Sequence, residues 1–326
     1  MEIVTKKRML IFSGSTHPAL AEEIARDLGE GLTASKLSRF ASGEIYFRAE
    51  DSVRGCDVFV IQTHADPINE SIMEQVIMLD ALKRASAKRI TAVVPYFGYS
   101  RQDHKGLARE PISAKVVADM ITSAGADRLV SVDLHSGQIQ GFVNFPFDHL
   151  TALPILSDYL RDRVLNEVDD LVVVAPDAGR IKTAERLSMH LASPLAFLYK
   201  RRSRHEAHLI EEMAVVGEVE GLPCVLIDDM VDTAGTVAKG AATLAQQGAG
   251  PIYVAATHAI LSGKAVQSLE EAPIKEVVVT NTVPIPEERQ FAKLTVLSIA
   301  PIIASAIRAV FEDTSVSEIF HGENQL

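Results

Sequence analysis

The feature that most constrains this chain is the repeated alternation of short apolar segments with amphipathic ones. The apolar segments are rich in Val, Ile and Leu, as is typical of strands buried on both faces of a parallel sheet. Residues 18–29, between two of them, begin with Pro and end with Gly, the usual asymmetry of a helix. The pattern predicts an α/β fold with mainly parallel sheets, flanked by helices and connected by right-handed crossovers. The expected strands are residues 9–12, 58–62, 90–94, 129–132, 171–175, 223–227, 252–256 and 276–279, and the expected helices are residues 18–29, 70–85, 111–125 and 237–247.

The length of the chain predicts two domains. It has 326 residues, whereas a typical domain has about 100–200. The first alternating series ends near residues 148–154, and a second series of strands and helices follows. We therefore predict an N-terminal domain of residues 1–150 and a C-terminal domain of residues 151–326. The last helix and the tail could instead pack on the N-terminal domain.

Composition narrows the classes of partner. A formal net charge of −11 argues against the basic face that nucleic-acid binding requires. It does not exclude phosphorylated small molecules, which a few arginines, backbone N–H groups and a metal can hold. No apolar run is long enough to cross a bilayer, and no signal-peptide pattern follows the charged N-terminus. The two cysteines, Cys56 and Cys224, cannot make a disulfide framework. Together, these features predict a soluble, cytoplasmic protein without nucleic-acid or membrane partners.

The strongest functional signal lies in residues 225–236, where an apolar strand is expected to end at Asp228 and Asp229. A short loop of small residues and a predicted helix follow, and their backbone N–H groups can bind a phosphate. Carboxylates would repel that phosphate unless they contact something else, such as sugar hydroxyls or a metal. The segment therefore predicts a sugar-phosphate site. A helix cap would explain only one of its carboxylates.

Two other expected strands are also followed by polar residues. Asp133 and His135 come after residues 129–132, and their i, i+2 spacing predicts side chains on one face. Asp177 follows residues 171–175. A His and an Asp at two strand ends could share a divalent cation, although Mg²⁺ prefers oxygen ligands. Taken alone, His135 could equally be a hydrogen-bonded histidine at a strand end.

Residues 200–204, with the sequence Lys-Arg-Arg-Ser-Arg, form a basic segment after the apolar residues 195–198. Taken alone, such a run is most often a solvated turn. Beside a phosphate site, however, its charges could stabilise oxygens that gain negative charge during phosphoryl transfer.

Together these segments resemble the ribose-phosphate pyrophosphokinases of the bacterial, phosphate-dependent type, from Ser13 to Phe320. Residues 228–236 are similar to the phosphoribosyl-diphosphate motif, which this family shares with type I phosphoribosyltransferases. Residues 130–141 look like the metal-binding stretch of the pyrophosphokinases. The resemblance implies two tandem phosphoribosyltransferase-like domains with the active site between them. It also implies transfer of the β,γ-diphosphate of ATP to the anomeric hydroxyl of ribose 5-phosphate, and a homohexamer.

The resemblance further implies roles for individual residues. Lys200 and Arg202 would be the catalytic pair of a flap, and His135 and Asp177 would be Mg²⁺ ligands. The implied ATP-binding residues are Phe40, Ser42, Gly43, Glu44, Arg101, Gln102 and Asp103; the ribose 5-phosphate residues are Asp228, Asp229, Asp232, Thr233, Ala234, Gly235 and Thr236; and the diphosphate loop is Asp177, Ala178, Gly179 and Arg180.

Several positions depart from the usual pattern of the family. Ser42 stands where many members have Asp, Tyr199 stands where an Asp often precedes the basic segment, and Ser203 replaces a common Pro. Residues 178–180 replace a Gly-Gly form of the diphosphate loop. These departures leave base selectivity and flap behaviour open. Two alternatives also remain: a type I phosphoribosyltransferase, which needs one such domain and no flap, and an inactive regulatory paralogue, for which damaged catalytic positions are expected.

Overall fold

The computed structural model describes residues 7–167, 170–201 and 212–320. The chain forms two compact units. Unit 1 comprises Met1–Thr151, Thr282–Pro284 and Ile299–Leu326, and unit 2 comprises Ala152–Asn281 and Ile285–Ser298. Within the described ranges, no helix is both long enough and apolar enough to cross a membrane.

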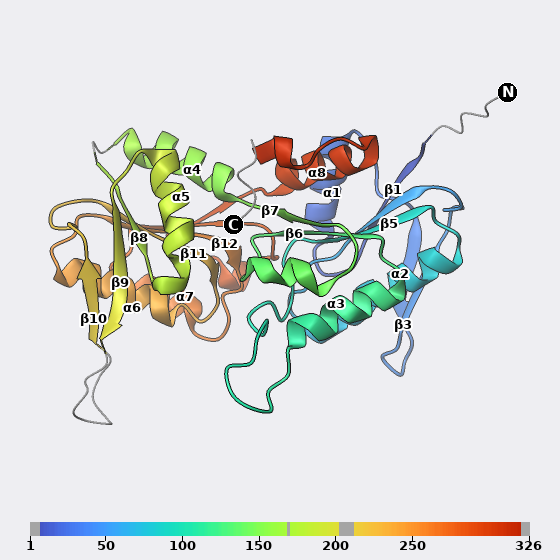
Figure 1. Ribbon diagram of the computed structural model, residues 1–326, viewed down its shortest axis with the longest axis horizontal. Helices are drawn as coiled ribbons and strands as arrows, with labels where there is room; N and C mark the ends of the chain where they lie inside the picture. The colour runs from blue at the N-terminus through green and yellow to red at the C-terminus, as the bar shows by residue number, and fades with distance from the viewer. Residues whose placement is uncertain (1–6, 168–169, 202–211, 321–326) are drawn as a thin grey trace. The chain divides into compact units, whose positions relative to one another are not determined.

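A five-stranded parallel sheet forms the centre of unit 1, in the order β1-β4-β5-β6-β7. Figure 1 shows helices α2 and α3 side by side below this sheet and helices α1 and α8 together above it. Strand β4 is buried along its whole length, because helices cover both faces of the sheet. The elements are β1 (Met9–Ser13), α1 (Pro18–Leu28), β4 (Asp57–Ile61), α2 (Ile68–Arg84), β5 (Arg89–Val94), α3 (Ser113–Ala124), β6 (Arg128–Val132), β7 (Phe147–Leu150) and α8 (Ala300–Glu312).

A separate antiparallel hairpin, β2 (Ser35–Arg39) and β3 (Ile45–Ala49), belongs to unit 1 and packs against α2. Its turn is closed by a hydrogen bond from the Phe40 N–H to the Glu44 carbonyl, with an N···O distance of 2.9 Å. Gly43 has φ +92° in this turn, a conformation that side chains disfavour. Strand β2 is largely polar and β3 is only five residues long, and the apolar pattern of the sequence did not predict either strand.

Unit 2 contains a seven-stranded sheet in the order β10-β9-β8-β11-β12-β13-β14. Its neighbouring strands are parallel, except that β10 runs antiparallel to β9. The fold class predicted from the sequence, α/β with mainly parallel sheets flanked by helices, is confirmed in both units. The elements are α4 (Leu153–Leu160), β8 (Val172–Ala175), α5 (Ile181–Leu191), β9 (Leu195–Arg201), β10 (Glu212–Val216), β11 (Cys224–Val231), α6 (Gly235–Gln246), β12 (Ile252–Ala259), α7 (Ala265–Glu271), β13 (Glu276–Thr280) and β14 (Leu294–Leu297).

Two predictions about strand ends in unit 2 are wrong. Strand β11 does not end at Asp228 and Asp229 but continues to Val231, because it pairs with β12 as far as Ala259. The basic segment does not begin as a loop at residue 200. Strand β9 extends through Arg201, where pairing with β10 stabilises it.

Candidate functional site

The two carboxylates of β11 lie beside an arginine from the loop after β8. The Nε of Arg180 is 3.1 Å from Oδ1 of Asp228, and its Nη2 is 3.2 Å from Oδ1 of Asp229. The exposed fractions of the side chains are 12% for Arg180, 17% for Asp228 and 6% for Asp229. The sequence predicted each residue for a site but did not predict these ion pairs. The structure thus brings together the acidic pair and the end of the predicted diphosphate loop within unit 2.

The acidic pair has an unusual protonation equilibrium. Burial, followed by the neighbouring Asp229, raises the pKa of Asp228 to about 8, while the charge of Arg180 acts in the opposite direction. The backbone N–H of Asp229 also donates to Oδ1 of Asp228, at 2.8 Å. Arg180 is therefore the cation that favours the ionised form of this carboxylate.

The loop after β11 leads directly into α6. Ala234 occupies the position before the helix, with φ +61°, and has no side-chain acceptor for the N–H groups at the start of α6. Thr233, Gly235 and Thr236 are exposed. The carboxylate of Asp232 accepts a hydrogen bond from the Ser262 hydroxyl, so one of its oxygens is engaged within the protein. An exposed loop with uncapped N–H groups at a helix start suits a phosphate.

The diphosphate loop predicted at residues 177–180 contains a short 3₁₀ helix, η3 (Ala178–Arg180), immediately before α5. Asp177 is exposed, and its Oδ1 accepts the Gly179 N–H at 2.8 Å. The Arg180 N–H donates to the Asp177 carbonyl at 3.2 Å. These bonds fix the backbone from which the Arg180 side chain reaches β11.

The predicted catalytic pair is only partly described. The backbone of Lys200 lies in β9, in register with Met213 of β10. Arg202 lies outside the described residues. The catalytic role of both residues stays a prediction.

In unit 1, the segment that contains His135 follows β6 in a turn. Asp133 has φ +35°, so the strand alternation on which Asp133 and His135 were predicted to share one face does not extend to these residues. The Asp133 N–H donates to the Leu150 carbonyl of β7 at 2.9 Å, and the Leu134 N–H donates to Nε2 of His149 at 2.9 Å. His149, which the sequence analysis missed because β7 was not predicted, therefore helps to hold the backbone beside His135.

The first group of predicted ATP residues lies in the turn of the β2–β3 hairpin. The Phe40 side chain is 57% exposed, and its ring lies edge-on to Tyr46 with 5.8 Å between centroids. The Ser42 hydroxyl donates to Oε2 of Glu44 at 2.7 Å. An exposed aromatic face next to polar side chains is suited to stacking on a base.

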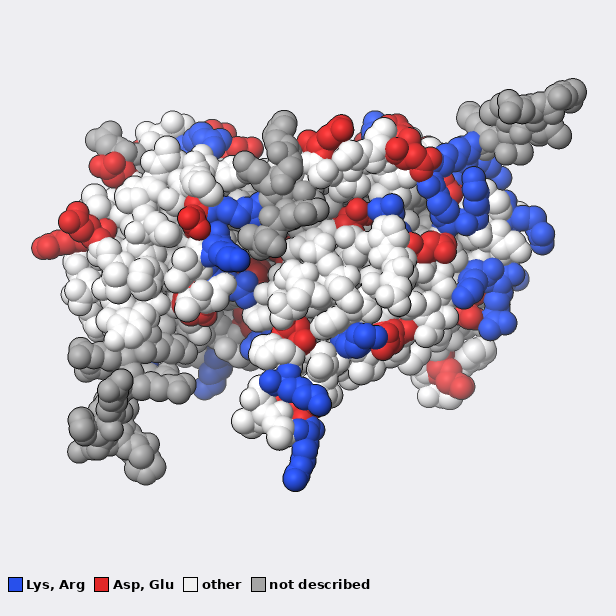
Figure 2. Space-filling model, viewed as in Figure 1, with Lys and Arg blue, Asp and Glu red and all other residues white. Residues whose placement is uncertain are grey.

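The second group lies in the long loop between β5 and α3, whose tip shows Lys and Arg side chains at the bottom of the view (Figure 2). Arg101 and Gln102 are exposed and line a cavity of about 370 Å³. Asp103 differs from them because it is buried and bound to the protein. Its carboxylate contacts Nδ1 of His104 at 2.6 Å and accepts from Nε2 of Gln138 at 2.8 Å. This burial favours a role for Asp103 in shaping the loop.

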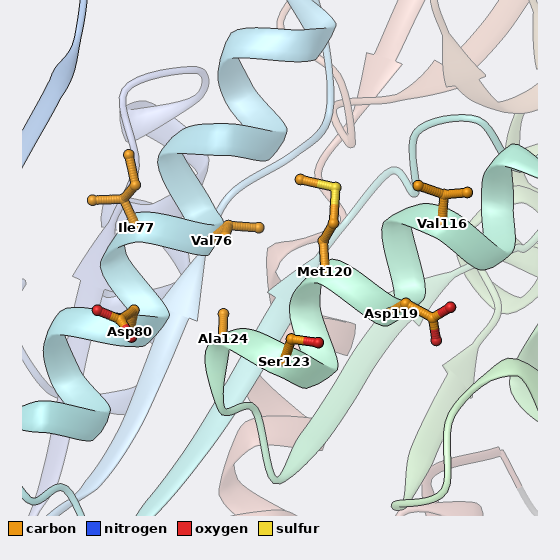
Figure 3. A pocket seen from close by; sticks show the side chains of 8 residues that line it. All are labelled: Val76, Ile77, Asp80, Val116, Asp119, Met120, Ser123 and Ala124. Atoms are coloured by element: carbon orange, nitrogen blue, oxygen red, sulfur yellow. The ribbon is translucent and has the colours of Figure 1, made fainter.

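A separate cavity of about 580 Å³ lies between α2 and α3 of unit 1 (Figure 3). Apolar side chains such as Val76, Val116 and Met120 line it. The carboxylates of Asp80 and Asp119 at this cavity are paired with Arg84 and Lys115 of their own helices. None of the predicted site residues lines this cavity, and both of its carboxylates are already paired within their own helices.

The described residues do not form a metal site in which protein side chains supply most of the ligands. Among the described residues, no cluster of three or more His, Cys, Asp or Glu side chains could hold a metal ion. Mg²⁺ commonly binds through one or two carboxylates, several waters and substrate phosphates. Asp177 is exposed and could provide one such carboxylate.

Two family models match the chain. The N-terminal domain of ribose phosphate pyrophosphokinase matches residues 9–125, and the phosphoribosyl synthetase-associated domain matches residues 200–321. A ribose-phosphate pyrophosphokinase of Bifidobacterium longum is 53% identical over 315 residues, which cover 96% of this chain and 93% of the relative. The chain belongs to the ribose-phosphate pyrophosphokinase family.

Other relatives agree with this assignment. A ribose-phosphate pyrophosphokinase of Mycobacterium tuberculosis is 50% identical over 319 residues, which cover 98% of this chain and 97% of the relative. The crystal structure of phosphoribosylpyrophosphate synthetase from Mycobacterium smegmatis superposes with a TM-score of 0.89 at 50% identity, covering 94% of this chain and all of that one. The family, the enzyme class and the fold predicted from the sequence are confirmed. The pyrophosphokinase interpretation holds over the two alternatives, a type I phosphoribosyltransferase and an inactive paralogue.

Proposed function

We propose that this ribose-phosphate pyrophosphokinase transfers the β,γ-diphosphate of ATP to the anomeric hydroxyl of ribose 5-phosphate, giving phosphoribosyl diphosphate and AMP. The observation that carries the proposal is the arrangement at the end of β11. Asp228 and Asp229 lie in the last part of β11, which leads through Val231 to an exposed loop at the start of α6. This arrangement supports a ligand that combines hydroxyls with a phosphate, as ribose 5-phosphate does.

Ribose 5-phosphate would bind in unit 2. Its ring hydroxyls would donate to carboxyl oxygens of Asp228 and Asp229, which can accept hydrogen bonds. Its 5-phosphate would accept from the backbone N–H groups of residues 232–236, whose alignment with α6 adds a favourable dipole.

ATP would bind to residues of unit 1. The adenine ring would stack on the exposed face of Phe40, with Ser42, Gly43 and Glu44 at its edge. Arg101 and Gln102 would contact the nucleotide from the loop after β5, where Lys and Arg provide positive charge for the phosphates. Asp103 would act from within the protein, by holding the backbone that presents Arg101 and Gln102.

The cofactor would be Mg²⁺, held by His135 and Asp177 together with phosphate oxygens and water. When bound, it supplies positive charge that neutralises the phosphate oxygens. Asp177 is exposed and has a second carboxylate oxygen beyond the one that accepts from Gly179. His135 is partly exposed on the turn that β7 holds.

The reaction would be a direct displacement at phosphorus. The anomeric oxygen forms a bond to the β-phosphorus, the bond from that phosphorus to the α,β-bridging oxygen breaks, and AMP leaves with the bonding electrons. The hydroxyl proton passes to solvent or to a phosphate oxygen. Lys200 and Arg202 would stabilise the charge that builds up on the transferred group, so the enzyme works by positioning and electrostatics.

We further propose that the protein is a cytoplasmic homo-oligomer, a hexamer by resemblance to its family. Size-exclusion chromatography with light scattering tests this assembly. A purely monomeric protein over the range of assay concentrations would contradict it.

The activity is tested by product analysis with purified protein, ATP, Mg²⁺ and ribose 5-phosphate. We expect AMP and phosphoribosyl diphosphate in equal amounts, and AMP only when ribose 5-phosphate is present. Release of ADP and inorganic phosphate, or AMP release that is independent of the sugar, would contradict the proposal.

A further inference from the structure

The loop before α5 carries an arginine whose side chain turns toward the acidic pair of β11. Nε and Nη2 lie on one edge of the Arg180 guanidinium, and each faces a different carboxylate, at 3.1 Å for Asp228 and 3.2 Å for Asp229. A planar guanidinium presents its N–H groups in a fixed fork. One side chain therefore sets the spacing of two carboxylates.

The surroundings make this contact important for binding. All three side chains are mostly buried, and two neighbouring carboxylates in such a place repel each other and favour protonation of one. A protonated carboxyl has fewer acceptor positions for a sugar hydroxyl. Burial and Asp229 raise the pKa of Asp228 to about 8 and so favour its protonated form, whereas the charge of Arg180 favours the ionised form.

We infer that Arg180 is a positioning residue, which holds Asp228 and Asp229 as a paired acceptor for the vicinal hydroxyls of ribose 5-phosphate. This inference rests on the proposed function, in which the pair binds the sugar. It assigns Arg180 a different task from the diphosphate contact that its place in the loop predicts. It also gives a reason for the departure from the Gly-Gly form of the loop. Arg180 reaches β11, whereas a glycine at this position would have no side chain to do so.

The test compares Arg180→Gln, which removes the charge, with Arg180→Lys, which keeps it but lacks the planar fork. Lys182→Ala is the matched control, because it removes one exposed positive charge two residues away on α5. Titration calorimetry would measure the affinity of each protein for ribose 5-phosphate, 2-deoxyribose 5-phosphate and magnesium ATP. The deoxy sugar lacks one of the two vicinal hydroxyls.

For Arg180→Gln we expect ribose 5-phosphate affinity to fall about 10–100-fold, the range for hydrogen bonds to charged groups. The deoxy sugar should lose less, so that the preference for ribose over deoxyribose shrinks, and affinity for magnesium ATP should stay the same. Arg180→Lys should recover part of the affinity but not the full preference. The control should match the original protein in all three titrations.

Three outcomes distinguish the possible failures. Unchanged affinity and sugar preference in Arg180→Gln, with weaker ATP binding or slower turnover, would mean that Arg180 acts on phosphates, and the inference would be wrong. If the original protein does not bind ribose 5-phosphate, the proposed function itself fails. If Arg180→Gln does not fold, the sugar preference of Arg180→Lys decides, and an unchanged preference overturns the inference.

Discussion

At the residue scale, the behaviour of a side chain depends on its immediate partners as much as on its type. Asp177, Asp228 and Asp229 all follow or lie within buried strands, yet Asp177 is exposed and caps a helix, whereas the other two share an arginine. We therefore expect substitutions at these positions to affect different substrates.

The acidic pair can be tested with substitutions that keep its shape. Asp228→Asn and Asp229→Asn each replace an acceptor oxygen by a donor, which conflicts with hydroxyl donors of the sugar. We expect each substitution to lower the affinity for ribose 5-phosphate by about 10–100-fold, while the affinity for ATP changes little. Titration calorimetry measures both. Equal losses for the two substrates would indicate a general disturbance of the fold and would count against the assignment.

Lys200 is predicted to act mainly in the transition state. Lys200→Ala should reduce kcat by about 10²–10³-fold, the usual cost of losing one electrostatic donor to the reacting group, with a much smaller effect on the KM values. Steady-state kinetics with both substrates provides the measurement, and Lys182→Ala is again the control. Near-normal kcat would remove Lys200 from the catalytic role.

At the element scale, β7 has a task that its short sequence does not reveal. It pairs with β6 and also provides His149, which is buried and accepts the Leu134 N–H. The neighbouring Asp133 adopts φ +35°, which is uncommon for a residue other than glycine. A strand at the edge of the sheet therefore stabilises the turn that presents His135.

This role of β7 predicts the effect of two substitutions. His149→Phe leaves the buried Leu134 N–H without its acceptor, which should lower the free energy of unfolding by about 1–3 kcal/mol. His149→Gln keeps an acceptor at a similar distance from the backbone and should be milder. Urea denaturation of both variants gives the measurement. Equal destabilisation by Phe and Gln would show that packing, not the hydrogen bond, makes His149 important.

At the scale of the whole molecule, segments from distant parts of the chain complete unit 1. Helix α8 packs beside α1, and Asp313 at its end is paired with Lys7 and Arg89. Arg89 also binds the buried Asp57 of β4, with Nη2 and Oδ2 at 2.6 Å. Pairing with Lys7 and then Arg89 lowers the pKa of Asp313 to about 2. The C-terminal helix is thus held in unit 1 by the ion pairs of Asp313 as well as by its packing against α1.

The Asp313 pair predicts a pH dependence of stability. A carboxyl group whose pKa is lower in the folded state stabilises the protein above its unfolded pKa of about 4, and this contribution is lost as pH falls toward 2. Asp313→Asn should therefore be less stable than the original protein at pH 7, and the difference should shrink on acidification to pH 2. Because Asp313 is exposed, added salt should reduce the difference at pH 7. Thermal unfolding at several pH values checks this, and a difference independent of pH and salt would contradict it.

The sequence by itself determined the alternation of strands and helices, the α/β class, the family and the segments that carry polar site residues. These features depend on local periodicity and on motifs that are contiguous in the chain. The tertiary structure decided that β11 continues past Asp228, that Asp133 leaves the strand conformation, and that Arg180 reaches two carboxylates on another strand. Strand pairing sets the first two, and a long-range ion pair sets the third. Periodicity within one segment cannot reveal them, because the stabilising partners come from other parts of the chain.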